Sequence, residues 1–305
     1  MIRLNFVTKP IEKQKEVVNN YYEELIIGRS EKFLSKLDKW CENNLKAILL
    51  NPELSDRKYK YLEQVIISDY QKLLKIKKNL EKSKLTLTDT LANYMKTTFY
   101  NSINKKKFAQ NLNISVCPYC NRNFINTSNK GGDCQIDHFF NKSDFPLFSV
   151  SLYNLVPVCG SCNYKKLTAN FNHSPYDSSL RTDDLIRFSY LPRSIGYLIN
   201  KEELEIKIEY LYNELLENDM KILELSDLYQ IHVDRVAELL KKKIIYNESY
   251  VNQIFNKYSD LFEGEYELDN LITDAYVEEQ FYEKRPLSKM ISDISREIGL
   301  IGGEK

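Results

Sequence analysis

The sequence predicts a mainly helical protein with a small, zinc-bound core that contains β-strands. Most of the chain has apolar residues at intervals of three and four, the period of a helix that is buried on one side. Between residues 111 and 175 this period disappears, and Asn, Gly, Pro and Cys become common. We therefore predict a helical N-terminal domain at 1–110, the zinc-bound core at 111–176 and a helical C-terminal region at 177–305.

The N-terminal domain is predicted to be a bundle of four helices. Ser30 is an N-cap candidate for the second helix, and the Asn-Pro pair at 51–52 would end it. The fourth helix is expected to end in the basic run at 105–107. Antiparallel neighbours joined by short connections would build the bundle, with helices at about 10–27, 31–49, 54–82 and 88–103.

The C-terminal region is predicted to be helical after a strand at 185–190, with helices at about 202–217, 223–246, 248–262 and 287–298 and a further segment near 267–283. Residues 202–283 carry 7 Lys or Arg against 21 Asp or Glu, whereas residues 101–176 carry 8 against 3. A basic core suits a polyanionic substrate, and the acidic segment is our candidate docking surface for a protein partner. Solvated helix faces remain the alternative explanation for these charges.

Five of the six cysteines lie between residues 117 and 162, and four of them form two Cys-x-x-Cys pairs. Such pairs are typical of a structural zinc site with four thiolates and no open coordination position. The predicted zinc ligands are Cys117, Cys120, Cys159 and Cys162. Unrelated buried thiols, or disulfides in an oxidising compartment, are the alternatives. Because this cysteine usage favours a reducing compartment, we expect a cytoplasmic protein, and no apolar run reaches the roughly 18 residues of a membrane span.

A second group of polar residues lies between the two cysteine pairs. Residues 124–125 and 134–136 are predicted to form a β-hairpin around a turn-rich stretch, with Asp137 and His138 at the end of its second strand. Asn163 follows the last zinc cysteine and opens a short helix that runs to about residue 169. A carboxylate and an amide oxygen are ligands that suit Mg²⁺, which keeps waters and phosphate oxygens in its other positions.

The order C-x-x-C, D-H, N, C-x-x-C-N-x-x-K resembles the HNH endonucleases, the ββα-metal nucleases with a four-cysteine zinc site. The resemblance covers roughly residues 114–170. It implies that His138 is the general base, that Asp137 and Asn163 hold a catalytic Mg²⁺ or Mn²⁺, and that Asn154 organises the loop between the strands. It also implies DNA as the substrate, and the candidate nucleic-acid contacts are Arg122, Lys165 and Lys166.

The implied reaction is the hydrolysis of a phosphodiester, in which His138 takes a proton from the attacking water. Many members of the family have His where this chain has Asn163, so metal affinity here would depend on one carboxylate and one amide. His173 is a further candidate for that metal site. The alternative reading is a zinc-knuckle scaffold that binds nucleic acid or protein without cutting.

The helical regions on both sides of the core resemble the layout of the stand-alone HNH proteins of bacterial anti-phage defence. Proteins of the Septu type among them work beside an ABC-like ATPase. The sequence has no G-x-x-x-x-G-K-[ST] motif, so any use of ATP would require such a partner.

Overall fold

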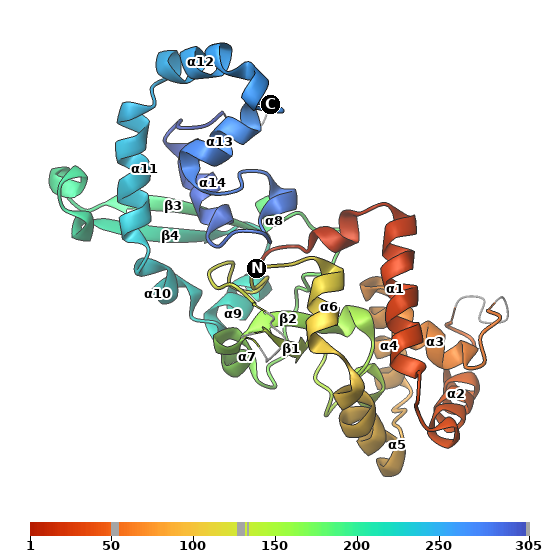
Figure 1. The fold of residues 1–305 in the computed structure, drawn as a ribbon. Coiled ribbons are helices and arrows are strands. Elements are labelled where there is room, and N and C mark those ends of the chain that lie inside the picture. The colour runs from red at the N-terminus through yellow and green to blue at the C-terminus, as the bar shows by residue number, and fades with distance from the viewer. Residues whose placement is uncertain (50–54, 127–131, 133, 303–305) are drawn as a thin grey trace. The chain divides into compact units, whose positions relative to one another are not determined.

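The computed structural model describes residues 1–49, 55–126, 132 and 134–302, and it is mainly helical with two small antiparallel sheets (Figure 1). The chain divides into two compact units. Unit 1 comprises Met1–Asn5, Ile114–Phe124 and the chain from Ser179 onward, and unit 2 comprises Phe6–Asn113 and Ile125–Ser178. The division into three domains stays a prediction.

In its described residues, unit 2 has six α-helices before its sheet. The first has the expected apolar face, because Val18, Tyr21, Tyr22 and Leu25 are all buried. Between the fifth and sixth helices the chain passes through a π-helical turn at Met95–Phe99. The helices are α1 (Ile11–Ile26), α2 (Glu31–Leu45), α3 (Lys60–Ile67), α4 (Tyr70–Lys82), α5 (Asp89–Tyr94) and α6 (Lys105–Leu112).

The sheet of unit 2 consists of β1 (Cys134–His138) and β2 (Leu155–Cys159), and α7 (Gly160–Lys166) follows directly. The strands are antiparallel, and their register pairs Cys134 with Cys159 and His138 with Leu155. Every residue of β2 is buried, as expected of a short apolar run inside a core.

The predicted hairpin was therefore wrong in its pairing. Phe124 forms an isolated bridge with Val116 instead, and the partner of β1 comes from residues 155–159. The apolar run at 155–159 has no alternation to mark it as a strand, which is why the sequence did not reveal it. Most of the predicted turn, at 127–131 and 133, lies outside the described residues, as does the predicted helix end at 51–52.

Unit 1 has a sheet of β3 (Ile186–Pro192) and β4 (Leu204–Tyr210), which are antiparallel. The sequence start belongs to this unit: Met1, Ile2 and Leu4 are buried, and the Ile2 amide donates to the Pro118 carbonyl at 2.7 Å. The helices are α8 (Thr182–Leu185), α9 (Glu214–Ile222), α10 (Leu225–Gln230), α11 (Val233–Ile245), α12 (Glu248–Lys257), α13 (Glu265–Thr273) and α14 (Ser288–Glu297).

The helix predicted at 202–217 was wrong for most of its length, because residues 204–210 form β4. Their sequence, LEIKIEY, alternates apolar and polar residues, and Leu204 and Ile206 are buried. An alternation of two is the strand period.

Other boundaries also differ from the predictions. The helix predicted at 54–82 is broken at Ser68, and the Asp69 side chain accepts from the Lys72 amide to cap the next helix. Likewise α10 and α11 divide the helix predicted at 223–246. The basic run at 105–107 begins α6, after the N-cap Asn104, rather than ending a helix.

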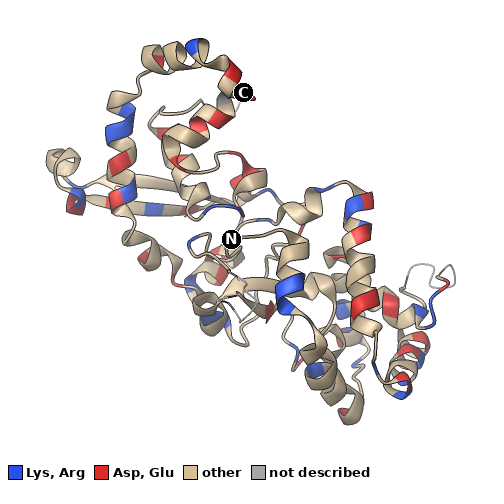
Figure 2. Cartoon of the chain, viewed as in Figure 1, with Lys and Arg blue, Asp and Glu red and all other residues tan. Residues whose placement is uncertain are grey.

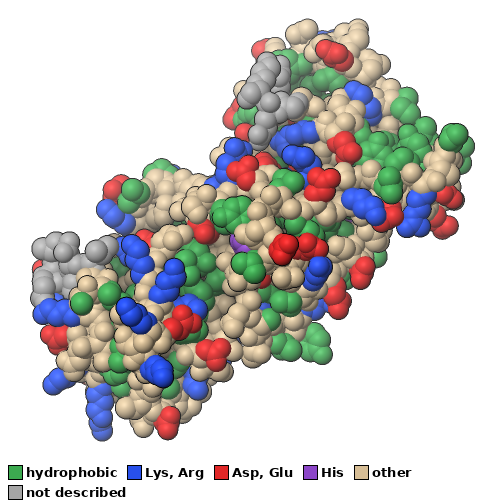
Figure 3. Space-filling model, turned by 180° about the vertical axis from the view of Figure 1, so that it is seen from behind, with side chains coloured by type: hydrophobic (Ala, Val, Ile, Leu, Met, Phe, Trp, Pro, Cys, Tyr) green, Lys and Arg blue, Asp and Glu red, His purple; other side chains and the backbone are tan. Residues whose placement is uncertain are grey.

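Charges of both signs are distributed over the helices. In Figure 2, both acidic and basic residues lie along α1 and α11. Figure 3 likewise shows basic side chains interspersed with acidic and apolar ones on the face that it presents. Segment 202–283 has an excess of acidic residues, but some of them form local ion pairs, such as Glu238 with Arg235 and Glu217 with Lys221. In the described part of the chain, no helix combines the length and the apolar character needed to cross a membrane.

Candidate functional site

The four predicted zinc cysteines form a cluster. The sulfur atoms of Cys117, Cys120, Cys159 and Cys162 all lie within 4.8 Å of one another, and all four residues are buried. A tetrahedral zinc ion holds thiolates at about 2.3 Å, which places the sulfurs roughly 3.8 Å apart. No disulfide links any of the six cysteines, all of which lie in the described part of the chain. The cluster is therefore compatible with a zinc ion.

The first cysteine pair lies in a tight turn within unit 1. The Arg122 amide donates to the Cys120 sulfur at 3.4 Å, and Asn121 takes the left-handed conformation with φ of 50°. Asn is one of the few non-glycine residues that tolerate this region. The Asn121 side chain donates to the Tyr282 carbonyl at 2.7 Å and accepts from the Lys289 amide at 3.1 Å. This side chain fixes the turn to the start of α14.

The second cysteine pair lies where β2 ends and α7 begins. Cys159 is both the last residue of the strand and the N-cap of the helix, and Cys162 is in the first turn. A side chain at Gly160 would meet the Gln135 amide nitrogen at 3.3 Å, so the helix start lies close against β1. The strand end and the helix start thus offer two sulfurs from one short segment.

His138 is buried at the end of β1, with 9% of its surface exposed. Its Nε2 atom lies 3.0 Å from the carbonyl oxygen of Ser149. A carbonyl can only accept, so Nε2 carries the hydrogen in the neutral ring and Nδ1 keeps a lone pair. The Tyr100 ring lies against the imidazole, with 4.6 Å between the ring centroids.

Burial lowers the pKa of His138 to about 4, and the nearby charges of Lys142, Lys166 and Lys105 lower it further. The hydrogen bond to Ser149 acts in the opposite direction. Near neutral pH the imidazole is therefore uncharged, the form that can accept a proton.

Asp137 is adjacent to His138 and forms an ion pair with Lys166. The Lys166 ammonium lies 3.2 Å from one carboxylate oxygen and 3.0 Å from the other, and it also donates to the His138 carbonyl at 3.0 Å. The Lys166 side chain is fully buried, and Asp137 is 4% exposed. Lys166 therefore compensates a buried negative charge, and its use as a nucleic-acid contact stays a prediction.

Asn154 connects both ends of the long loop between β1 and β2. Its side chain accepts from the Phe140 amide at 2.7 Å and donates to the carbonyls of Phe140 and Phe148 at 3.1 and 3.0 Å. The residue is fully buried. These three bonds hold the loop that also carries Ser149, the partner of His138.

Asn163 and Lys166 are one turn apart on α7 and face the same side of β1. Lys166 reaches Asp137, and the Asn163 amide donates to the Gln135 side chain at 2.6 Å. Gln135 and Asp137 are two residues apart, so they share a face of the strand. Asp137 and Asn163 therefore lie at the same face of β1. Asp137 contacts Lys166, whereas Asn163 contacts Gln135.

The other predicted residues lie in different surroundings. Arg122, in unit 1, donates to the His232 ring at 3.1 Å and lies over the Tyr229 ring. His173 is buried in the segment after α7, and Lys165 is half-buried on that helix. Their parts in binding nucleic acid or metal stay predictions.

Four residues near His138 were missed by the sequence reasoning. Tyr100 contacts the imidazole, Lys105 and Lys142 lie over the Tyr100 ring, and Lys96 acts on Lys142 electrostatically. The basic run at 105–107 was the only signal for any of them, because Tyr100 and Lys142 belong to no motif.

Asp137 offers a carboxylate oxygen and Asn163 an amide oxygen. Both are types of ligand atom that a catalytic divalent ion binds. The Lys166 ammonium already occupies the position of a cation beside Asp137. A metal ion bound there would therefore share the carboxylate with Lys166 or displace it.

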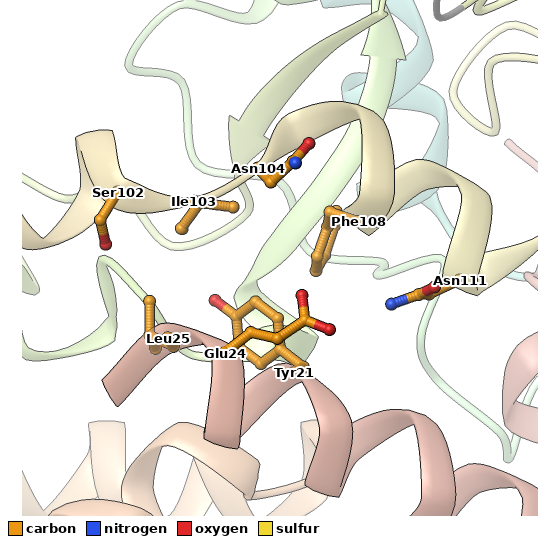
Figure 4. A pocket seen from close by; sticks show the side chains of 8 residues that line it. All are labelled: Tyr21, Glu24, Leu25, Ser102, Ile103, Asn104, Phe108 and Asn111. Atoms are coloured by element: carbon orange, nitrogen blue, oxygen red, sulfur yellow. The ribbon is translucent and has the colours of Figure 1, made fainter. Parts of the chain in front are cut away.

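A separate cavity of about 170 Å³ lies between α1 and the segment at 102–111 (Figure 4). Its lining includes Tyr21, Glu24, Phe108 and Asn111, and none of the predicted site residues. The Tyr21 hydroxyl donates to the Val150 carbonyl at 2.8 Å, which accounts for its buried polar group. This cavity is therefore not the predicted site.

Comparisons of the chain with protein-family models, with curated proteins and with solved structures find no match.

Proposed function

We propose that this chain is a metal-dependent HNH endonuclease that hydrolyses phosphodiester bonds in DNA. The observation that carries the proposal is the hydrogen bond from His138 Nε2 to the Ser149 carbonyl. It fixes the tautomer in which Nδ1 has the lone pair that a general base needs.

The order of elements supports the same proposal. An antiparallel pair, β1 and β2, is followed at once by α7, which is the arrangement of a ββα-metal core. Asn154 ties the loop between the strands through three side-chain hydrogen bonds, as the middle Asn of the motif would. We assign the cysteine cluster to a structural zinc ion.

In the proposed reaction, His138 Nδ1 takes a proton from water and the water oxygen attacks phosphorus in line. The bond from phosphorus to the 3′ oxygen breaks, and that oxygen takes a proton from solvent. Asp137 and Asn163 would hold the Mg²⁺ or Mn²⁺ ion, which stabilises negative charge on the phosphate and the leaving oxygen when bound. Asn154 positions His138 through the loop that carries Ser149.

The test is nicking of supercoiled plasmid by the full chain with Mg²⁺ or Mn²⁺. We expect wild type to nick the plasmid and His138→Ala to lose at least about a hundredfold in rate, the lower end of what a general base contributes. Lys36→Gln, an exposed change on α2, is the matched control and should cut like wild type. Equal rates for wild type and His138→Ala would refute the proposal.

Zinc content tests the structural half of the proposal. Elemental analysis of the purified chain should give about one zinc per molecule, because four thiolates close one tetrahedral site. Cys162→Ser should lower that content. A stable protein with far less than one zinc per chain would contradict the assignment of the cluster.

A non-catalytic scaffold is the second candidate function, and the ion pair of Asp137 with Lys166 favours it. A carboxylate that is already neutralised by a buried ammonium has less need of a metal ion. Wild type that binds DNA but never nicks it, with the proposed partner present, would favour this reading.

We place the proposed nuclease in anti-phage defence or restriction, beside an ABC-like ATPase. The acidic segment 202–283 is the proposed contact for that partner. Co-expression with a candidate ATPase, followed by purification through a tag on this chain, tests the placement. Failure of the two proteins to co-purify at low salt would count against it.

A further inference from the structure

Two lysines from different elements of unit 2 lie over the Tyr100 ring beside His138, and a third lysine, Lys96, is near one of them. The Lys142 ammonium, from the loop between β1 and β2, lies 4.6 Å from the centroid of the Tyr100 ring. The Lys105 ammonium, from the start of α6, lies 5.8 Å from the same centroid. Lys96, from the π-helical turn, is close enough to lower the pKa of Lys142.

These lysines have no acidic partner among the described residues. Burial lowers the pKa of Lys142 first, and the charges of Lys105 and Lys96 lower it further, with no carboxylate acting in the opposite direction. Lys107, in the same turn of α6 as Lys105, differs in this respect because it pairs with Glu24. Among the described residues, the group at Tyr100 is thus a concentration of positive charge without a carboxylate partner.

The position of Lys105 adds to the cost of this arrangement. It is the first residue of α6, where the helix dipole is positive and a cation is unfavourable. Like charges held over one ring also repel one another. A bound anion removes both costs at once.

We infer that Lys105 and Lys142, with Lys96 beside them, bind phosphate groups of a nucleic-acid strand next to the phosphodiester that is attacked by the water from which His138 takes a proton. This inference rests on the proposed function and names the contacts that would hold its substrate. Tyr100 is only 8% exposed, so its ring is closed to stacking with a base. The contact is therefore with the backbone and independent of base sequence.

The test measures binding of a fluorescein-labelled DNA duplex by anisotropy, in buffer without Mg²⁺ or Mn²⁺, over a series of salt concentrations. Each lost phosphate contact should lower the slope of log K against log salt by about 0.9 for duplex DNA. We expect that loss for Lys105→Gln and for Lys142→Gln, about twice the loss for the double variant, and roughly fivefold to tenfold weaker binding for each single variant near 0.1 M salt. Lys36→Gln is the control, with an unchanged slope.

A double variant with the wild-type slope would overturn this inference. The inference would also be overturned if inorganic phosphate displaced the labelled duplex as readily as unlabelled duplex does at the same phosphate concentration. The site would then bind free phosphate. Because no divalent ion is present, the result is independent of cutting. Binding that depends on these lysines in a chain that never nicks DNA would leave the inference standing and overturn the nuclease proposal.

Discussion

Asp137 and His138 are neighbours at the end of β1, and their side chains have different electrostatic surroundings. The Asp137 carboxylate forms an ion pair with the Lys166 ammonium, and both side chains are buried. His138 is flanked by Lys105 and Lys142, which have no acidic partner within the described residues. Successive side chains of a strand point to opposite faces. Asp137 and His138 are adjacent in the chain, but their side chains therefore lie in different surroundings.

This difference separates lysines that serve the fold from lysines that are available to a ligand. The charge of Lys166 is used inside the protein, where removing it would leave a carboxylate buried without a partner. The positive charges of Lys105 and Lys142 near His138 repel each other, so they destabilise the fold rather than stabilise it. Substitution on the Asp137 side should therefore change stability strongly, and substitution on the His138 side should change binding more than stability.

The largest expected effect comes from Lys166→Met. This change removes the counter-charge of Asp137, which is 4% exposed, together with the hydrogen bond to the His138 carbonyl. Removing one partner of a buried ion pair typically costs about 3–5 kcal/mol. We expect the free energy of unfolding in urea to fall by an amount in that range.

The double variant Asp137→Asn with Lys166→Met provides the control. Because it removes both charges, it should lose clearly less stability than the sum of the two single variants. Additive losses would show that the two charges do not interact as described. Millimolar Mg²⁺ that stabilises Lys166→Met but not Asp137→Asn with Lys166→Met would sharpen the assignment of Asp137 as a metal ligand.

The next effect is a pH dependence of stability that arises from His138. Burial lowers its pKa from 6.5 to about 4, so the unfolded chain binds a proton more readily than the folded one between these values. The stability from the neutral imidazole is complete above pH 6.5 and is lost as pH falls towards 4. At about 1.4 kcal/mol per pH unit, the loss between pH 7 and pH 5 is about 2 kcal/mol.

Urea unfolding of wild type and of His138→Gln at several pH values measures this effect. The difference between the two proteins isolates His138, because every other ionisable group is present in both. Parallel curves from pH 7 to pH 5 would contradict a lowered pKa. The same shift places the acid limit of the proposed nicking reaction below pH 6.5.

The sequence was sufficient for residues whose chemistry depends on spacing along the chain. The cysteine spacings predicted the four-sulfur cluster, and the pair at 137–138 was correctly placed at a strand end. The helical period likewise predicted α1, α2 and α14. In each case the signal lies within a few consecutive residues, where spacing and geometry are directly related.

Features that depend on distant segments were not predicted. The partner of β1 is the unpatterned run at 155–159, and the Ser149 carbonyl that orients His138 reaches it through a loop held by Asn154. A backbone carbonyl has no sequence signature. The contact of Tyr100 with His138 requires the turn before α6 to lie against β1, which only tertiary packing determines.

The smallest expected effect comes from Lys142→Gln in the absence of nucleic acid. The change removes repulsion with Lys105 and Lys96, but it also removes a cation–π contact with Tyr100 that contributes about 0.5–1 kcal/mol at exposed sites. The net change in the free energy of unfolding should lie within about 0.5 kcal/mol of zero.

Since salt screens the repulsion, the variant should gain stability relative to wild type as ionic strength falls. Urea unfolding of both proteins at low and high salt, with Lys36→Gln as the reference, measures this trend. A loss above about 1 kcal/mol at low salt would mean that Lys142 has an internal acidic partner, and the contrast with Lys166 would then disappear.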